Sequence, residues 1–307
     1  MTAFAPEPSL QLVAGIDLTR RSEAAFNTAV QLAIERDAAL TVVHVIPADL
    51  PERVAKAHAE YAETLVQDHV SRANTAGLKK ITPVIAHGRD YEALVEQADI
   101  ARADVIVLGT HRQRGGMADI LGTTIDRVLR LSSKPVLLAR KPYQQPYQRI
   151  LVAVDFSAIS RRAIDTALTL FPEAEFLAVN TWGWRRKPND GASGQQSELG
   201  EAHRLALKSL VHEVVQMARP STDDRPPRVF ELVAPGLPSV VVPELAHERL
   251  IDLIVVGTHA RDGLSRFLIG SVAEEIMLRT EADILAIPPA HAVPAAAAAG
   301  VNSPVVA

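Results

Sequence analysis

The chain contains no cysteine, which excludes a disulfide framework and any chemistry that needs a thiolate. It also has little excess charge: the formal net charge is −4 at pH 7, whereas a general nucleic-acid binder usually carries a basic face. No apolar run approaches the roughly 20 residues that cross a bilayer, and residues 1–10 lack the basic and apolar regions of a secretory signal. We therefore expect a cytoplasmic protein with neither a membrane nor a nucleic acid as its partner.

The sequence does have enough length and apolar content for two folded units. Its 307 residues suit two domains of about 150 residues each. Hydrophobic residues make up 48% of the chain and charged residues 22%, a balance typical of folded globular proteins and not of disordered ones.

A short motif occurs twice at one fixed offset. Gly109-Thr110-His111 is followed by Gly122-Thr123, and Gly257-Thr258-His259 is followed by Gly270-Ser271, so the copies lie 148 positions apart. Each copy follows a short apolar run. The repeat indicates that the chain is a tandem of one fold, and that each copy once had a loop shaped to approach a phosphate.

Strand-type runs alternate with helix-type segments in both halves of the chain. We expect strands at Leu10–Ile16, Leu40–Val45, Ile81–Ala86, Val105–Leu108 and Pro135–Ala139, and again at Arg149–Val154, Glu175–Asn180, Arg228–Ala234, Leu253–Val256 and Asp283–Ile287. We expect helices from about Arg20, at Pro51–Ala76, at Tyr91–Ala101 and after Gly122, and again from Ala158 with Ser157 as N-cap, at Glu198–Met217, at Pro238–His247 and after Gly270.

This alternation predicts two α/β units, each with a five-stranded parallel sheet between layers of helices. The units are expected at residues 10–141 (unit 1) and 148–288 (unit 2), followed by a disordered tail at 289–307. Their last strands, Pro135–Ala139 and Asp283–Ile287, are expected to lie side by side, so that the two units form an internal pseudo-dimer in which each covers the other's edge strand.

The repeated loop residues are expected at the carboxyl ends of the strands, where open α/β sheets bind their ligands. Asp17 and Asp155 follow the first strands, and Gly122 and Gly270 are expected to begin helices whose positive N-terminal ends suit a phosphate. Simpler roles remain open: both aspartates suit turns, and the histidines of the repeat suit a bond that holds the loop.

The pattern Gly-x-x-Gly-x9-Gly-Ser/Thr after the fourth strand resembles the nucleotide loop of the universal stress protein family. The segment Gly257–Met277 (GTHARDGLSRFLIGSVAEEIM) is very similar to that family, and Gly109–Val128 matches it in the first copy. The resemblance covers residues 10–288. It implies Rossmann-like (adenine nucleotide alpha hydrolase-like) units and a homodimer, together with ATP and Mg²⁺ as ligands for those members that bind nucleotide.

The resemblance also implies a set of ligand-binding positions in each unit. These are Asp17, Val45, Gly109, Arg112, Gly122, Thr123 and Thr124 in unit 1, and Asp155, Thr181, Gly257, Ala260, Gly270, Ser271 and Val272 in unit 2. The family's middle glycine is missing from both units, because Arg112 and Ala260 stand at its place. A Cβ there costs free energy if the position needs positive φ or close ligand approach. Ala260 adds only one methyl group, and the Arg112 guanidinium is itself able to pair with a phosphate.

Three functions follow from these observations. The first is a stress protein that binds an adenine nucleotide and changes its protein partners or oligomeric state with occupancy. The second is an interaction scaffold whose degenerate loops no longer bind nucleotide. The third is a slow ATPase, which is disfavoured because the chain has no P-loop lysine motif and no positioned general base.

Overall fold

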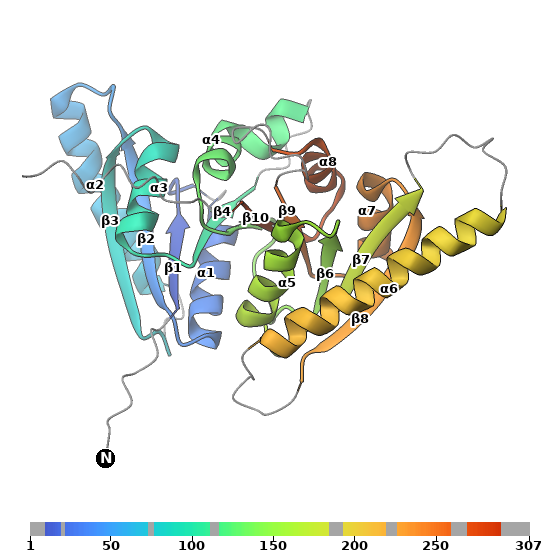
Figure 1. Ribbon diagram of the computed structural model, residues 1–307. Coiled ribbons are helices and arrows are strands. Elements are labelled where there is room, and N and C mark those ends of the chain that lie inside the picture. Colours follow the sequence, from blue (N-terminus) through green and yellow to red (C-terminus); the bar gives the residue numbers. More distant parts are fainter. Residues whose placement is uncertain are drawn as a thin grey trace, which may run out of the picture.

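The computed structural model describes residues 10–19, 22–72, 77–110, 117–183, 193–218, 226–258 and 269–289. Figure 1 shows their elements in chain order. The strands are β1 (Gln11–Gly15), β2 (Ala39–Pro47), β3 (Lys80–Gly88), β4 (Val105–Gly109), β5 (Val136–Ala139), β6 (Arg149–Val154), β7 (Glu175–Gly183), β8 (Arg228–Gly236), β9 (Leu253–Gly257) and β10 (Asp283–Ile287). The helices are α1 (Glu23–Glu35), α2 (Glu52–Arg72), α3 (Asp90–Ile100), α4 (Met117–Leu131), α5 (Ala158–Leu170), α6 (Ser193–Met217), α7 (Pro238–Glu248) and α8 (Ser271–Arg279).

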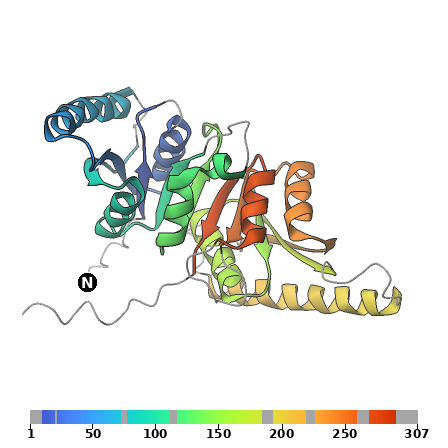
Figure 2. The ribbon, with the colours of Figure 1, turned by 90° about the horizontal axis from the view of Figure 1, so that it is seen from above.

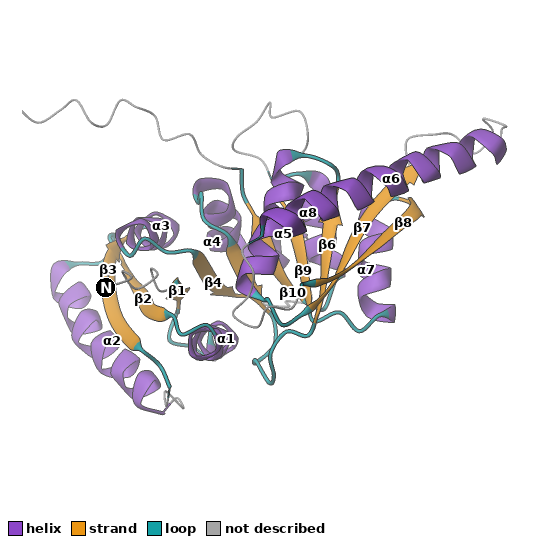
Figure 3. Cartoon of the chain, turned by 60° about the horizontal axis from the view of Figure 1, so that its bottom comes forward, coloured by secondary structure: helices purple, strands orange, loops and turns teal. Residues whose placement is uncertain are grey.

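The strands form because short apolar runs are buried on both faces of one sheet. Every residue of β5 and β10 is buried, as are the first four residues of β4 and β9. One hydrophobic cluster packs α1, α2, α5 and α6 on one face, and a second packs α3, α4, α7 and α8 on the other. Figure 3 shows the strands as a layer between helices. The predicted α/β architecture is therefore confirmed, with both layers continuous across the two units.

The two units share one sheet of ten strands in the order β3-β2-β1-β4-β5-β10-β9-β6-β7-β8. Neighbouring strands within each unit are parallel, whereas β5 and β10 pair antiparallel, with Leu285 opposite Leu137. Figure 2 shows the units side by side across this seam. The predicted pairing of the last strands is confirmed. Because the seam is antiparallel, the carboxyl ends of the strands of unit 1 and of unit 2 lie at opposite edges of the sheet.

The prediction of Ser157 as a helix N-cap can be tested directly. Ser157 is the N-cap of α5, since its hydroxyl oxygen accepts a hydrogen bond from the amide of Ser160 at 3.1 Å, as predicted.

Trp182 lies against α6, where a Cβ on Gly200 would come within 3.1 Å of the indole ring. The glycine therefore allows close contact between β7 and α6. The expected tail at 289–307 lies, from residue 290 on, outside the described residues.

Candidate functional site

Each unit has a point at its carboxyl edge where the strand order reverses. In unit 2, β6 lies between β9 and β7, and the chain leaves β6 toward β7 and returns later to β9. The carboxyl ends of β6 and β9 therefore form the crevice where such sheets bind ligands. Asp155 follows β6 and Gly257 ends β9, so both predicted residues flank this point. Thr181 lies within β7, two residues before its end, and so does Val45 within β2 of unit 1.

Hydrogen bonds close the long loop of unit 2 on itself. The Thr258 amide donates to the carbonyl of Ile287 at 2.9 Å, and the Gly270 amide donates to the carbonyl of Thr258 at 2.6 Å. Gly270 therefore lies beside Thr258, the residue that follows Gly257, although the two glycines are 13 positions apart in the sequence (257 and 270). Ala260 and His259 belong to residues 259–268, which lie outside the described residues.

Helix α8 begins at the predicted position. Gly270 is its N-cap, with φ −61° and ψ 134°, and no side chain of the described residues caps the helix there. Ser271 and Val272 follow and are exposed. The first amides of a helix have no partner within the helix and lie at the positive end of its dipole. The geometry therefore suits an anion at this end of α8.

The two aspartates form turns at the start of the candidate site. A carboxylate oxygen of Asp155 accepts a hydrogen bond from the Ser157 amide at 3.0 Å, and one of Asp17 accepts from the amide and hydroxyl of Thr19 at 2.9 and 2.8 Å. The residues after the aspartates, Leu18 and Phe156, have φ of 58° and 65°. Left-handed backbone at non-glycine residues is uncommon and often found at functional sites. The turn role is thus present in both units, and the ligand role of the aspartates stays a prediction.

Gly257 has a packing role besides its predicted one. A Cβ at this position would lie 2.7 Å from Cγ2 of Ile159, near the start of α5. Any larger residue would push α5 away from the end of β9. The same glycine that would let a phosphate approach is therefore also needed for the fold.

Unit 1 differs from the prediction at its last glycine. The Thr110 amide bonds the Ala139 carbonyl at 3.0 Å, as its counterpart does in unit 2. However, α4 begins at Met117, so Gly122 and Thr123 lie within the helix and not at its start. The prediction of a helix beginning after Gly122 was wrong, because the preceding residues Met-Ala-Asp-Ile-Leu themselves continue the helical pattern. Arg112 belongs to residues 111–116, which are not described.

Thr124, a further predicted position of unit 1, lies in the middle of α4, which packs against α3. Its hydroxyl donates to the carboxylate of Asp90, at the start of α3. Nearby, the Arg127 guanidinium lies over the Tyr91 ring at 4.7 Å from the centroid. Thr124 therefore joins two helices, and Gly109 is the predicted residue that most clearly keeps its place at the strand end of unit 1.

A pair of polar side chains missed by the sequence analysis holds the ends of β1 and β6. A ring nitrogen of His44, Nδ1, lies 3.0 Å from the Ile16 carbonyl, and Nδ2 of Asn180 donates to the Val154 carbonyl at 2.8 Å. Burial above all lowers the pKa of His44, so its neutral ring donates from Nδ1. Both residues occupy the same position of the repeat. The different residue types concealed this shared role in the sequence.

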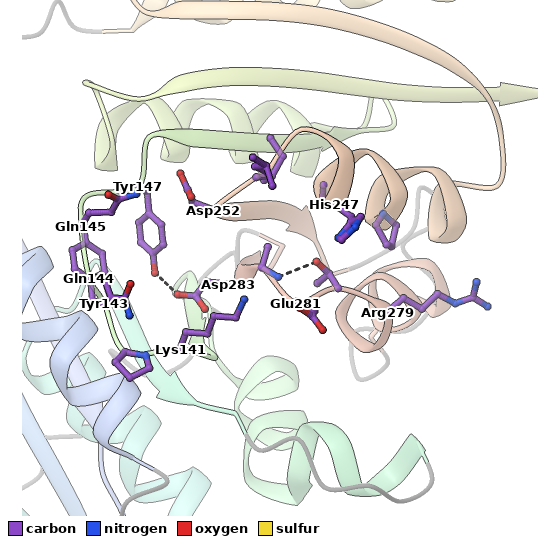
Figure 4. A pocket seen from close by; sticks show the side chains of 17 residues that line it. Lys141, Tyr143, Gln144, Gln145, Tyr147, His247, Asp252, Arg279, Glu281 and Asp283 are labelled. Carbon is purple, nitrogen blue, oxygen red and sulfur yellow. Dashed lines mark hydrogen bonds between the residues drawn. The ribbon is translucent and has the colours of Figure 1, made fainter.

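A cavity of about 740 Å³ is shown in Figure 4. It is bounded by the linker between the units, the end of α7 and the loop from α8 to β10. Tyr147 of the linker donates its hydroxyl to the buried carboxylate of Asp283 at 2.6 Å, and the Arg140 amide donates to the other oxygen at 2.8 Å. These bonds fasten the linker to the first residue of β10.

The buried Asp283 carboxyl predicts a measurable pH dependence of stability. Burial raises its pKa above the usual value, and the bonds from Tyr147 and Arg140 oppose that shift. The folded protein then keeps this proton at pH values where the unfolded chain has lost it. The contribution of Asp283 to the free energy of unfolding therefore falls as the pH rises through that interval. Asp283→Asn removes the ionisation.

Urea denaturation of both proteins between about pH 3 and pH 7 measures this effect. We expect the variant to gain stability relative to the wild type as the pH rises. A difference that stays constant with pH would show that the Asp283 carboxyl does not titrate differently in the two states.

Two further features are absent from the described residues. No group of three or more histidine, aspartate or glutamate side chains in this part of the chain is placed to hold a metal ion. No helix in it combines the length and the apolar content needed to cross a membrane.

Known proteins match both halves of the chain. The sequence model of the universal stress protein family matches residues 10–140 and 146–288. A universal stress protein of Mycobacterium tuberculosis is 28% identical over 302 residues, which is 89% of this chain and 95% of the relative. Another from Haemophilus influenzae, a universal stress protein E homolog, is 24% identical over 247 residues, 73% of this chain and 74% of the relative.

Solved structures show the same fold. A universal stress protein from Archaeoglobus fulgidus superimposes with a TM-score of 0.68 at 16% identity, covering 91% of this chain and 98% of that one. A functionally unknown protein from Pseudomonas aeruginosa superimposes with a TM-score of 0.63 at 18% identity, covering 91% and 92%.

Proposed function

This chain belongs to the universal stress protein family, and on that premise we propose that its unit 2 binds ATP or another adenine nucleotide. The base and ribose would lie over the ends of β6 and β7, and the phosphates would lie at the N-terminus of α8. Occupancy would change the oligomeric state or the protein partners of a cytoplasmic stress protein, which we propose to be a homodimer of whole chains.

One observation carries the proposal. The bond from the Gly270 amide to the Thr258 carbonyl, at 2.6 Å, sets the uncapped start of α8 beside the end of β9. A phosphate at this point would accept hydrogen bonds from the exposed first-turn amides and meet the positive end of the helix. The Ser271 hydroxyl is next to it and adds a donor.

Mg²⁺ would arrive with the nucleotide. In nucleotide sites Mg²⁺ is commonly held by phosphate oxygens, water and one or two carboxylates. Asp155 follows β6 and is the acidic residue of unit 2 among the predicted positions, and one of its oxygens accepts from the Ser157 amide. In this proposal the nucleotide acts as a ligand, and any hydrolysis is incidental.

The structure of unit 1 supports the alternative function, an interaction scaffold that does not bind nucleotide. There α4 begins at Met117, five residues before Gly122, so the last glycine of the repeat does not offer a helix start to a phosphate. We therefore propose that unit 1 serves as the structural half of the tandem, and that the nucleotide binds to unit 2 alone.

Thermal unfolding of the full chain tests the proposal. A ligand that binds only the folded state raises its stability by about 2.7 kcal/mol at 100 times its Kd. We expect ATP with Mg²⁺ to raise the melting temperature, while Mg²⁺ alone has no such effect. No increase at millimolar ATP, with protein shown to be free of co-purified nucleotide, would contradict nucleotide binding.

A further inference from the structure

We infer that His203, on α6, is a positioning residue that holds the Asp155 turn of unit 2 in place through Asn180. This inference rests on the proposed nucleotide site, because Asp155 is one of its residues. His203 comes from a helix that contributes none of the positions implied by the family resemblance. Figure 1 shows α6 running along the outside of β7 and β8, and α6 also contacts α5.

A chain of two hydrogen bonds links α6 to the end of β6. The ring nitrogen Nδ1 of His203 lies 2.7 Å from Oδ1 of Asn180, whose Nδ2 donates to the Val154 carbonyl at 2.8 Å. Asn180 is only 3% exposed. Since its amide nitrogen is donating to Val154, its oxygen is left to accept, and the imidazole supplies the N–H. A buried amide is therefore satisfied at both ends, and its orientation is fixed.

His203 also touches the other side of the turn. The ring of Phe156 lies edge-on to the His203 ring, with the centroids 5.7 Å apart and the planes at 65°. Phe156 has φ 65°, a conformation that persists only where the surroundings hold it. Asp155 stands between Val154 and Phe156, and His203 acts on both neighbours. Its loss would release the turn on two sides at once.

Unit 1 provides a comparison, because His44 stands there at the position that Asn180 occupies in unit 2. His44 bonds the Ile16 carbonyl directly at 3.0 Å, and His58 of α2 lies edge-on to it at 5.7 Å between centroids. Nε2 of His44 has no hydrogen-bond partner among the described residues. The second helix of unit 1 therefore contacts His44 of β2 by ring packing. In unit 2 the second helix reaches the end of β6 through two hydrogen bonds.

A consequence is that ligand binding and the docking of α6 are coupled. Whatever stabilises the Asp155 turn stabilises the contact of His203 with Asn180, and the reverse also holds.

The test compares His203→Ala with His203→Gln, which keeps an N–H donor, and with His212→Ala, a substitution at an exposed position of the same helix. The first readout needs no nucleotide: hydrogen exchange of the amides at residues 155–158. We expect exchange about ten-fold faster in His203→Ala, as the loss of one buried hydrogen bond with its partner left unpaired implies. His212→Ala should match the wild type, and β6 and β7 should stay protected in all variants.

The second readout is the affinity for ATP with Mg²⁺. We expect about ten-fold weaker binding by His203→Ala, with most of the affinity restored in His203→Gln and none lost in His212→Ala. Unchanged exchange of the turn in His203→Ala would overturn the inference. So would faster exchange with unchanged ATP affinity, because the turn would then not matter to the site. If the wild type itself binds no ATP, the proposed function fails, and the exchange result alone decides whether His203 holds the Asp155 turn.

Discussion

Gly270→Val is expected to abolish nucleotide binding while leaving the protein folded. The backbone at Gly270 has φ −61° and ψ 134°, a conformation that valine adopts without strain. The amide that bonds Thr258 is retained. The branched side chain, however, would stand where a phosphate must approach the first amides of α8. The loss of two hydrogen bonds to a charged phosphate weakens binding by about 3 kcal/mol or more, which is at least about 100-fold in Kd.

The matched control is Gly122→Val, the same substitution at the same position of the repeat in unit 1. Gly122 lies within α4, where valine has a slightly better helix propensity than glycine. We expect this variant to bind ATP with the affinity of the wild type. Loss of binding in Gly122→Val, with binding kept in Gly270→Val, would assign the nucleotide to unit 1 instead. If the wild type, Gly270→Val and Gly122→Val all bound ATP with equal affinity, the start of α8 would not be part of the binding site.

Leu285→Ala is expected to cost about 2–5 kcal/mol in the free energy of unfolding. Leu285 is fully buried in β10, opposite Leu137 of β5 at the antiparallel seam between the units. Replacing it with alanine leaves a cavity that the crowded strands on both sides are unable to fill. Because this seam joins the two units within one sheet, the substitution also weakens the pseudo-dimer. Urea denaturation followed by circular dichroism measures the loss.

Leu131→Ala serves as the control for the core substitution. Leu131 ends α4 and is 42% exposed, so its truncation should change stability by no more than about 0.5 kcal/mol. If Leu285→Ala were as mild as this control, β5 and β10 would not form a continuous core in solution, and the two units would behave as independent domains.

The central strands were predictable from the sequence because their chemistry is uniform. The runs Leu253–Val256 and Ile284–Ile287 are apolar over their length and buried on both faces, which is what a parallel sheet between two helical layers requires. The outer strands β3 and β8 extend two residues beyond their predicted ends. They end at Gly88 and Gly236, whose φ values of 143° and 125° are accessible to glycine.

The parts of the candidate site that depend on the backbone at glycine were partly predictable. The hydrogen bonds between side chains of distant elements were not. Gly270 begins a helix as expected, but Gly122 does not, since five helix-compatible residues precede it. The link from His203 to Asn180 joins residues 23 positions apart on different elements. No periodicity reveals such a contact, and the counterpart of Asn180 in unit 1 is a histidine.

Nucleotide binding by unit 2 is tested most directly by a calorimetric titration of the nucleotide-free full chain with ATP and Mg²⁺, which measures affinity and the number of sites together. We expect a single site per chain, which is lost in Gly270→Val and kept in Gly122→Val. Two equal sites per chain would contradict the assignment of unit 1 to a structural role. A titration without heat at several temperatures, from folded protein at millimolar ATP, would contradict nucleotide binding and leave the tandem as an interaction scaffold.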